Sequence, residues 1–224
     1  MKTNFSEMTF KGIAKTILGY LGISMAVAVA VVGMVFGILS VTQKNYCYTI
    51  FKSKAELNYY TSKDAVVKCL DEFIKSNAPE SAMNGFALLD KCDEYNVDVR
   101  FATAQALIEG HFATKGVAAK THSAFNVMAY DGRSAGDMIK KGHAYKHPDE
   151  SIEPYLKLLT TQYMVNGKTE MDLMDKYVNK DGKRYASSTT YEQSLRSAYQ
   201  TLITETNITA LYAEYQKYKM ICGK

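Results

Sequence analysis

Residues 17–41 form an uncharged run rich in Ile, Leu, Val, Ala and Gly, which limits the possible folds more than any other feature of the sequence. A helix rises ~1.5 Å per residue, so a run of this length can cross the ~30 Å hydrocarbon core of a bilayer. We therefore predict a transmembrane helix at residues 17–41, preceded by a cytoplasmic N-terminus at residues 1–16.

Lysines flank this run on both sides and affect its predicted orientation. Those before it are Lys2, Lys11 and Lys15, and those after it are Lys44, Lys52 and Lys54. The first group places the N-terminus in the cytoplasm by the positive-inside bias, although the second group weakens the asymmetry. A cleaved signal peptide is the alternative, because Ala26-Val27-Ala28 is a small-x-small site, but cleavage there would leave an apolar remnant through Val41. We predict a single-pass membrane anchor with an extracytoplasmic C-terminal domain in the cell envelope.

The remainder of the 224-residue chain is long enough for one well-buried domain. The net charge of +4 is too small to indicate binding to a polyanion, so no nucleic-acid partner is predicted. Tyrosines and lysines are interspersed in residues 42–62, a composition common beside a bilayer surface, and we predict a stalk there. The domain itself is predicted at residues 63–224.

Helical periodicity dominates this predicted domain. Apolar residues recur at helical spacing in the segments 63–76, 81–95, 98–110, 148–165, 191–204 and 208–221. Asp98 is the predicted N-cap of the third segment, and Gly110 is predicted to stop it. Because no internal repeat is visible, we predict one mostly helical domain.

Cysteine and histidine spacing gives no indication of a metal or cofactor. Cys47, Cys69, Cys92 and Cys222 contain no Cys-x-x-Cys pair, which argues against zinc or a thioredoxin-like site. Disulfides between Cys69 and Cys92 or between Cys47 and Cys222 remain open, as do free buried thiols. His143 and His147 are four residues apart, but residues 142–147 precede a proline and are predicted to be an extended strand, which would separate the two by ~13 Å.

Glu109 is the carboxylate best placed for chemistry. It lies in the last turn of the predicted helix 98–110, near the negative end of the helix dipole, and follows Leu107 and Ile108 directly. Both the dipole and apolar surroundings disfavour the ionised form, so we expect a raised pKa for Glu109. A raised pKa lets a carboxylic acid hold its proton near neutral pH and give it to a leaving oxygen.

Several motifs occur in the order found in one enzyme family. They are the frame Ala104-Gln105-Ala106-Leu107-Ile108-Glu109-Gly110-His111-Phe112, then Phe125-Asn126-Val127, then Asp149-Glu150-Ser151-Ile152-Glu153-Pro154-Tyr155, and finally Arg184-Tyr185-Ala186-Ser187-Ser188-Thr189-Thr190-Tyr191. From about residue 86 to residue 210 the chain resembles glycoside hydrolase family 73, the glucosaminidase-type peptidoglycan hydrolases. The resemblance implies an α+β, mostly α, lysozyme-like domain with a small β-lobe.

The resemblance also implies roles for individual residues. Glu109 would be the general acid, and Tyr191 or Tyr185 would face the substrate near the cleaved bond. Phe125 and Asn126 would shape the floor of the groove. Tyr130, at the end of the Phe125 motif, and Glu150 complete the implied substrate-binding set.

The second catalytic carboxylate is the least defined part of the predicted site. The family more often reads Glu-Ser-Gly-(Trp/Phe)-Gly, where this chain has Gly110, His111 and Ala113 after the acid. Asp131 is the first candidate for a second acid, although Asp-Gly also fits a turn. Glu150 is the next, although an acid in the first turn of a helix is more simply a capping residue. Failing both, the N-acetyl group of the sugar could assist.

The predicted function is therefore hydrolysis of the β-1,4 bond between N-acetylglucosamine and N-acetylmuramic acid in peptidoglycan glycan strands. Lytic transglycosylation by the same acid is one alternative. A catalytically silent module for wall binding or assembly is another. A bacterial envelope protein and a phage-encoded wall-opening protein both fit the sequence.

Overall fold

The computed structural model describes Lys15, Met34, Val41, residues 49–127 and residues 134–224. The chain divides into two compact units, Met1–Glu56 and Leu57–Lys224. Nearly all of the predicted transmembrane helix, residues 17–41, lies outside the described residues. Among the residues that are described, no helix combines the length and the apolar character that crossing a membrane requires. The structure thus adds no support to the prediction of a membrane span.

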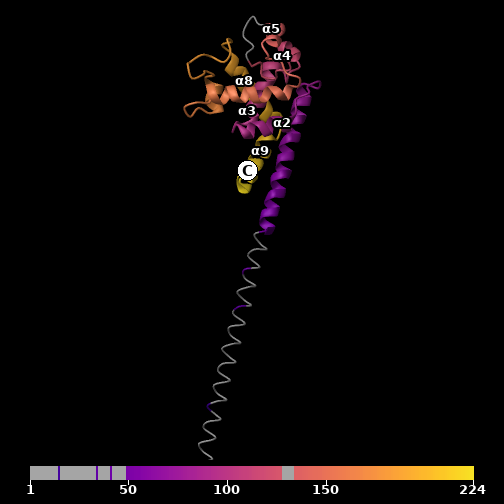
Figure 1. Ribbon diagram of the computed structural model, residues 1–224, viewed down its shortest axis with the longest axis vertical. Helices are drawn as coiled ribbons and strands as arrows, with labels where there is room; N and C mark the ends of the chain where they lie inside the picture. The colour runs from indigo at the N-terminus through magenta and orange to yellow at the C-terminus, as the bar shows by residue number, and fades with distance from the viewer. Residues whose placement is uncertain (1–14, 16–33, 35–40, 42–48, 128–133) are drawn as a thin grey trace, which may run out of the picture. The chain divides into compact units, whose positions relative to one another are not determined.

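The second unit is a bundle of helices, which confirms the mostly helical prediction (Figure 1). It begins with helical residues 57–77. The helices that follow are α2 (Gly85–Glu94), α3 (Val99–Gly110), α4 (Gly116–Thr121), α5 (Ala135–Lys140), the 3-10 turn η1 (Pro148–Ser151), α6 (Ile152–Leu158), the π-turn η2 (Leu159–Tyr163), α7 (Glu170–Asp175), α8 (Tyr191–Glu205) and α9 (Ile208–Cys222). Residues 57–62, predicted as the end of a stalk, belong to this unit, where Tyr59 packs on Tyr215.

Helix α3 forms the centre of the unit and packs against α2, α4 and α8 (Figure 1). Every residue from Val99 to Ala106 is buried except Arg100, which is half-buried. The small side chains of Ala102, Ala104 and Ala106 suit this position because they let neighbouring helices approach closely. Because most of α3 is buried, each buried polar side chain on it must find a hydrogen-bond partner inside the protein.

The predicted start of α3 is correct, and its end is built differently from the prediction. Asp98 is the N-cap and accepts a hydrogen bond of 2.8 Å from the backbone N–H of Arg100. Gly110 remains helical, and His111 is the left-handed cap with a φ of 51°. A glycine is nevertheless required at position 110, because a Cβ there would lie 2.3 Å from the Cβ of Ala118.

The predicted small β-lobe is wrong for the residues that the structure describes. The segment 134–147 contains helix α5, and residues 143–145, predicted as part of a strand, have no regular structure. A capping box explains the helix: Ser134 accepts from the N–H of Asp137, and the Asp137 carboxylate accepts from the N–H of Ser134. In the described part of the chain, β-pairing is limited to the isolated bridge between Val178 and Arg184.

The three described cysteines are free thiols. Cys69 and Cys92 are buried, and Cys222 is half-buried. A disulfide between Cys69 and Cys92, one of the alternatives from the sequence, is therefore not formed. Cys47 lies outside the described residues.

Candidate active site

Glu109 and Tyr191 meet where α3 ends and α8 begins. The Tyr191 hydroxyl donates a hydrogen bond to Oε1 of Glu109, joining residues 82 positions apart in the chain. The packing of α3 on α8 makes this contact, because Glu109 lies in the last turn of one helix and Tyr191 is the first residue of the other. Glu109 is half-buried there.

The Phe125-Asn126 turn closes the end of α3. The side-chain amide of Asn126 donates to the backbone carbonyl of Glu109, and Asn126 itself is left-handed, with a φ of 48°. Phe125 is fully buried and stacks on Tyr155, with ring centroids 3.9 Å apart. The turn thus fixes the backbone that carries the acid, while Oδ1 of Asn126 is buried without a hydrogen-bond partner among the described residues.

The surroundings of Glu109 favour its protonated form. Burial raises the pKa of Glu109 from 4.5 to about 7, and the hydrogen bonds from Tyr191 and Asn126 oppose part of this rise. Desolvation penalises the charged carboxylate, whereas donors stabilise it. Glu109 therefore holds a proton near neutral pH and has a donor in place when it loses that proton.

A cluster of tyrosines surrounds the acid. Tyr185 stacks on Tyr177 with centroids 4.5 Å apart, packs on Tyr191 at 5.5 Å, and donates a 3.3 Å hydrogen bond from its hydroxyl to the carbonyl of Phe125. Burial raises the pKa of Tyr155, Tyr177, Tyr185 and Tyr191 well above 10. These phenols consequently stay neutral and can act as hydrogen-bond donors.

Gln105 lies one helical turn before Glu109 and is fully buried. Its Oε1 accepts from the hydroxyls of Tyr155 and Tyr177, at 2.8 and 2.9 Å. Its Nε2 donates to the hydroxyl oxygen of Tyr191 at 3.2 Å. Gln105 lies in the motif Ala104 to Phe112, but the sequence alone indicated no role for it. The one feature of the sequence that could have identified it is a side-chain amide on a helix whose neighbouring residues are apolar.

A salt bridge holds the loop that precedes α8. Glu192 accepts from the backbone N–H of Tyr177 at 3.1 Å and from the Arg184 guanidinium at 2.6 Å. The Glu192 side chain is 12 % exposed. These contacts fix the segment that carries Tyr177 and Tyr185, so Glu192 supports the site from outside it.

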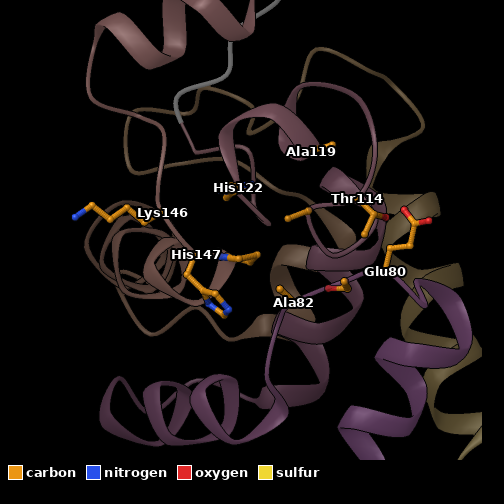
Figure 2. Close-up of a pocket in the computed structure, with 10 residues that line it drawn as sticks. Glu80, Ala82, Thr114, Ala119, His122, Lys146 and His147 are labelled. Atoms are coloured by element: carbon orange, nitrogen blue, oxygen red, sulfur yellow. The ribbon is translucent and has the colours of Figure 1, made fainter.

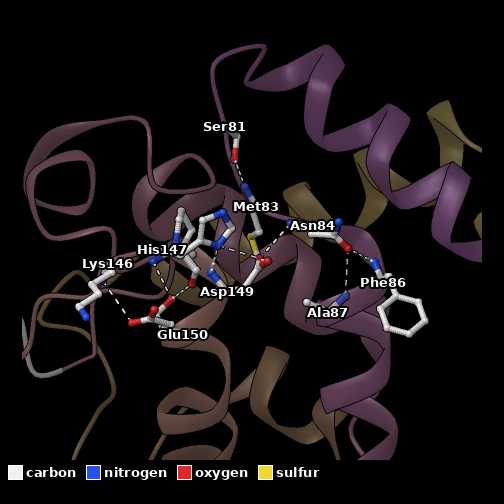
Figure 3. Close-up of polar contacts among 12 residues, drawn as sticks. Ser81, Met83, Asn84, Phe86, Ala87, Lys146, His147, Asp149 and Glu150 are labelled. Atoms are coloured by element: carbon white, nitrogen blue, oxygen red, sulfur yellow. Dashed lines mark hydrogen bonds and ion pairs between the residues drawn. The ribbon is translucent and has the colours of Figure 1, made fainter.

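The remaining predicted site residues lie elsewhere or outside the described residues. Tyr130 and Asp131 belong to the segment 128–133, which the structure does not describe. Oε2 of Glu150 accepts from the backbone N–H of Lys146 at 3.2 Å, and the neighbouring Asp149 accepts from the N–H of Asn84 at 2.9 Å (Figure 3). This hydrogen bond ties Glu150 to the loop before α6.

A hollow of about 360 Å³ lies beside this loop. His147 and Lys146 line it on one side, and Thr114 and Glu80 line it on the other (Figure 2). The imidazole of His122, also in the lining, bonds to the carbonyl of Tyr145 at 2.9 Å. Among the residues that the structure describes, no group of three His, Cys, Asp or Glu side chains could hold a metal ion.

These features define a class of protein: a helical domain that holds, beside a tyrosine hydroxyl, a carboxylic acid whose pKa burial raises to about 7, as acid catalysis requires. Residues 85–204 match the Glucosaminidase family, described as mannosyl-glycoprotein endo-beta-N-acetylglucosaminidase. Because the match covers more than half of the 224 residues, the chain belongs to this family and contains a glucosaminidase-type peptidoglycan hydrolase domain. Searches of curated proteins and of solved structures found no match.

Proposed function

We propose that the domain hydrolyses the β-1,4 bond between N-acetylglucosamine and N-acetylmuramic acid in peptidoglycan, with Glu109 as the general acid. One observation carries this proposal: burial raises the pKa of Glu109 to about 7. An ordinary glutamate is almost fully ionised at neutral pH and has no proton to give. Membership of the Glucosaminidase family supports the glycan substrate.

In the proposed reaction, protonated Glu109 gives its proton to the glycosidic oxygen as the bond from that oxygen to the sugar breaks. The carboxylate that remains accepts the hydrogen bond from Tyr191, which is already in place. A preorganised donor of this kind stabilises charge as it develops, without reorganisation at that moment. A water molecule then completes hydrolysis at the sugar carbon.

The group that activates water or stabilises the sugar cation is also part of the proposal. Asp131 stays the first candidate because it follows the Phe125-Asn126 turn that closes α3. The hydrogen bond between Glu150 and Lys146 favours a structural role for Glu150. Assistance by the N-acetyl group of the substrate is the third route, and it needs no second carboxylate.

Mass spectrometry of muropeptides released from purified cell walls by the full chain tests this function. We expect products with reducing N-acetylglucosamine ends, and a loss of rate of at least ~10²-fold in Glu109→Gln. Glu72→Gln is the matched control, because it makes the same change on an exposed side chain of residues 57–77. Glu109→Gln activity equal to that of wild type would exclude Glu109 as the acid.

Lytic transglycosylation is the second candidate. One observation favours it: in the described part of the chain, the Glu109 side chain has a tyrosine and no second carboxylate as a partner. The same experiment separates the two reactions, because transglycosylation leaves anhydromuramic ends. A silent wall-binding module would instead bind walls tightly and release no product.

Residues 17–41 are proposed as an uncleaved membrane anchor with the domain outside the cytoplasm. The apolar composition of the run supports this arrangement. The membrane fraction of cells expressing the full chain should contain the protein at its full mass. A shortened, freely released protein would instead indicate cleavage.

A further inference from the structure

We propose that Gln105 is a positioning residue for the acid: it sets the direction of the hydrogen bond from Tyr191 so that the phenolic proton points at Glu109. This inference rests on the proposed function, since it concerns how the acid is prepared for proton transfer. Gln105 itself touches neither the carboxylate nor, by this account, the substrate.

The amide of Gln105 has its orientation fixed at the oxygen. Two hydroxyl donors, from Tyr155 on α6 and Tyr177 in the loop before α8, both point at Oε1. A carbonyl oxygen has two lone pairs, so this acceptor is filled. Reversing the amide would remove the buried acceptor that both phenols use, which costs free energy for each of them.

The fixed amide in turn determines the proton position on Tyr191. Nε2 of Gln105 donates to the hydroxyl oxygen of Tyr191. The phenolic hydrogen must then point away from Gln105, and the acceptor it meets is Oε1 of Glu109. Every donor in this series of hydrogen bonds therefore points toward the carboxylate. Hydrogen bonds aligned in this way strengthen one another by roughly 10–30 % each.

Of the described neighbours of Glu109, Tyr191 contributes most to stabilising its charge. Among the residues that the structure describes, the titratable groups that face Glu109 are Tyr191 on α8, Tyr177 and Tyr185 in the preceding loop, and Tyr155 on α6. All are neutral phenols. Within the described part of the chain, the donors that act on the carboxylate are the amide of Asn126 and the hydroxyl of Tyr191, and Gln105 orients that hydroxyl.

The test is the pKa of Glu109, measured in the full chain by ¹³C NMR of the carboxyl group. Gln105→Met keeps the volume but removes the donor, so the pKa should rise by about 0.5–1 unit as the Tyr191 bond weakens. In a Tyr191→Phe background, Gln105→Met should add less than about 0.2 unit, because the relay is already broken.

Thr103→Val is the matched control. Thr103 is equally buried on α3, but its hydroxyl bonds to the carbonyl of Val99, so its loss should leave the pKa of Glu109 unchanged. If Gln105→Met does not fold, the double variant Tyr155→Phe and Tyr177→Phe frees the amide instead and should move the pKa in the same direction.

An unchanged pKa in folded Gln105→Met, or an equal shift with and without Tyr191, overturns the proposal. The titration needs no substrate, so its outcome is independent of whether the chain cleaves peptidoglycan. Where cleavage is observed, the fall in kcat at high pH should move upward by the same amount in Gln105→Met, with KM unchanged. A structural defect alone would not move that pH profile.

Discussion

At the scale of single residues, Glu109 is an acid because desolvation outweighs the donors that hold it. Burial raises its pKa, while Tyr191 and Asn126 lower it only in part, leaving a value of about 7. The position of Glu109 at a helix end and its apolar neighbours could be predicted from the sequence. The donors were not, since Tyr191 meets Glu109 only through the packing of α8 on α3.

The substitution Tyr191→Phe tests the hydrogen bond that the Tyr191 hydroxyl donates to Glu109. Without it the carboxylate left after proton transfer is less stable, so kcat should fall by roughly 10- to 100-fold. The pKa of Glu109 should rise, and the high-pH fall in activity should move to higher pH. Rates across pH 5–9 measure both effects. A lower kcat with an unmoved pH profile would mean that Tyr191 acts on the substrate and not on Glu109.

Glu109 should also make folding stability depend on pH. Its pKa is about 7 when folded and about 4.5 when unfolded, so the folded state binds more protons between these values. Stability is therefore lost as pH rises through this window, by about 1–3 kcal/mol. Glu109→Gln should be more stable than wild type at pH 8 and equal to it at pH 4. Urea unfolding at both pH values checks this, and equal stability at pH 8 would contradict the raised pKa.

At the scale of elements, the end of α3 depends on a close approach to α4. Gly110 provides it, because its Cα faces Ala118 without room for a side chain. His111, Phe112 and Ala113 then follow in left-handed conformations, with φ values of 51°, 55° and 65°. The sequence indicated that a glycine ends the helix, but the reason for it, a contact with another helix, required the tertiary structure.

Gly110→Ala should destabilise the domain by about 1–3 kcal/mol, because the new methyl group overpacks against Ala118. Adding Ala118→Gly should restore part of the loss. Gly136→Ala on exposed α5 is the control, since its Cβ would meet Ser134 Oγ at an ordinary 3.6 Å. Thermal unfolding compares the variants. Equal effects at positions 110 and 136 would show that backbone entropy, and not the contact, explains the glycine.

At the scale of the whole molecule, local signals predicted the longer helices but not the short helices α4, α5 and α7, and tertiary contacts assemble the site. Periodicity predicted α3, α8 and α9 nearly to the residue. The network around Gln105 was beyond such reasoning, because Tyr155, Tyr177 and Tyr191 lie 50 to 86 positions from it along the chain. The β-lobe was predicted from the resemblance, and the strand at residues 142–147 from the proline that follows it; both predictions are wrong in the described residues, where the local capping box at Ser134 produces a helix.

The pH dependence of glycan cleavage, compared with the ¹³C titration of Glu109 in the same protein, tests the central claim most directly. The account predicts that kcat on purified peptidoglycan falls with an apparent pKa of about 7, and that the carboxyl of Glu109 titrates at the same value. A Glu109 carboxyl that titrates near its ordinary value of 4.5 while cleavage proceeds at neutral pH would contradict it.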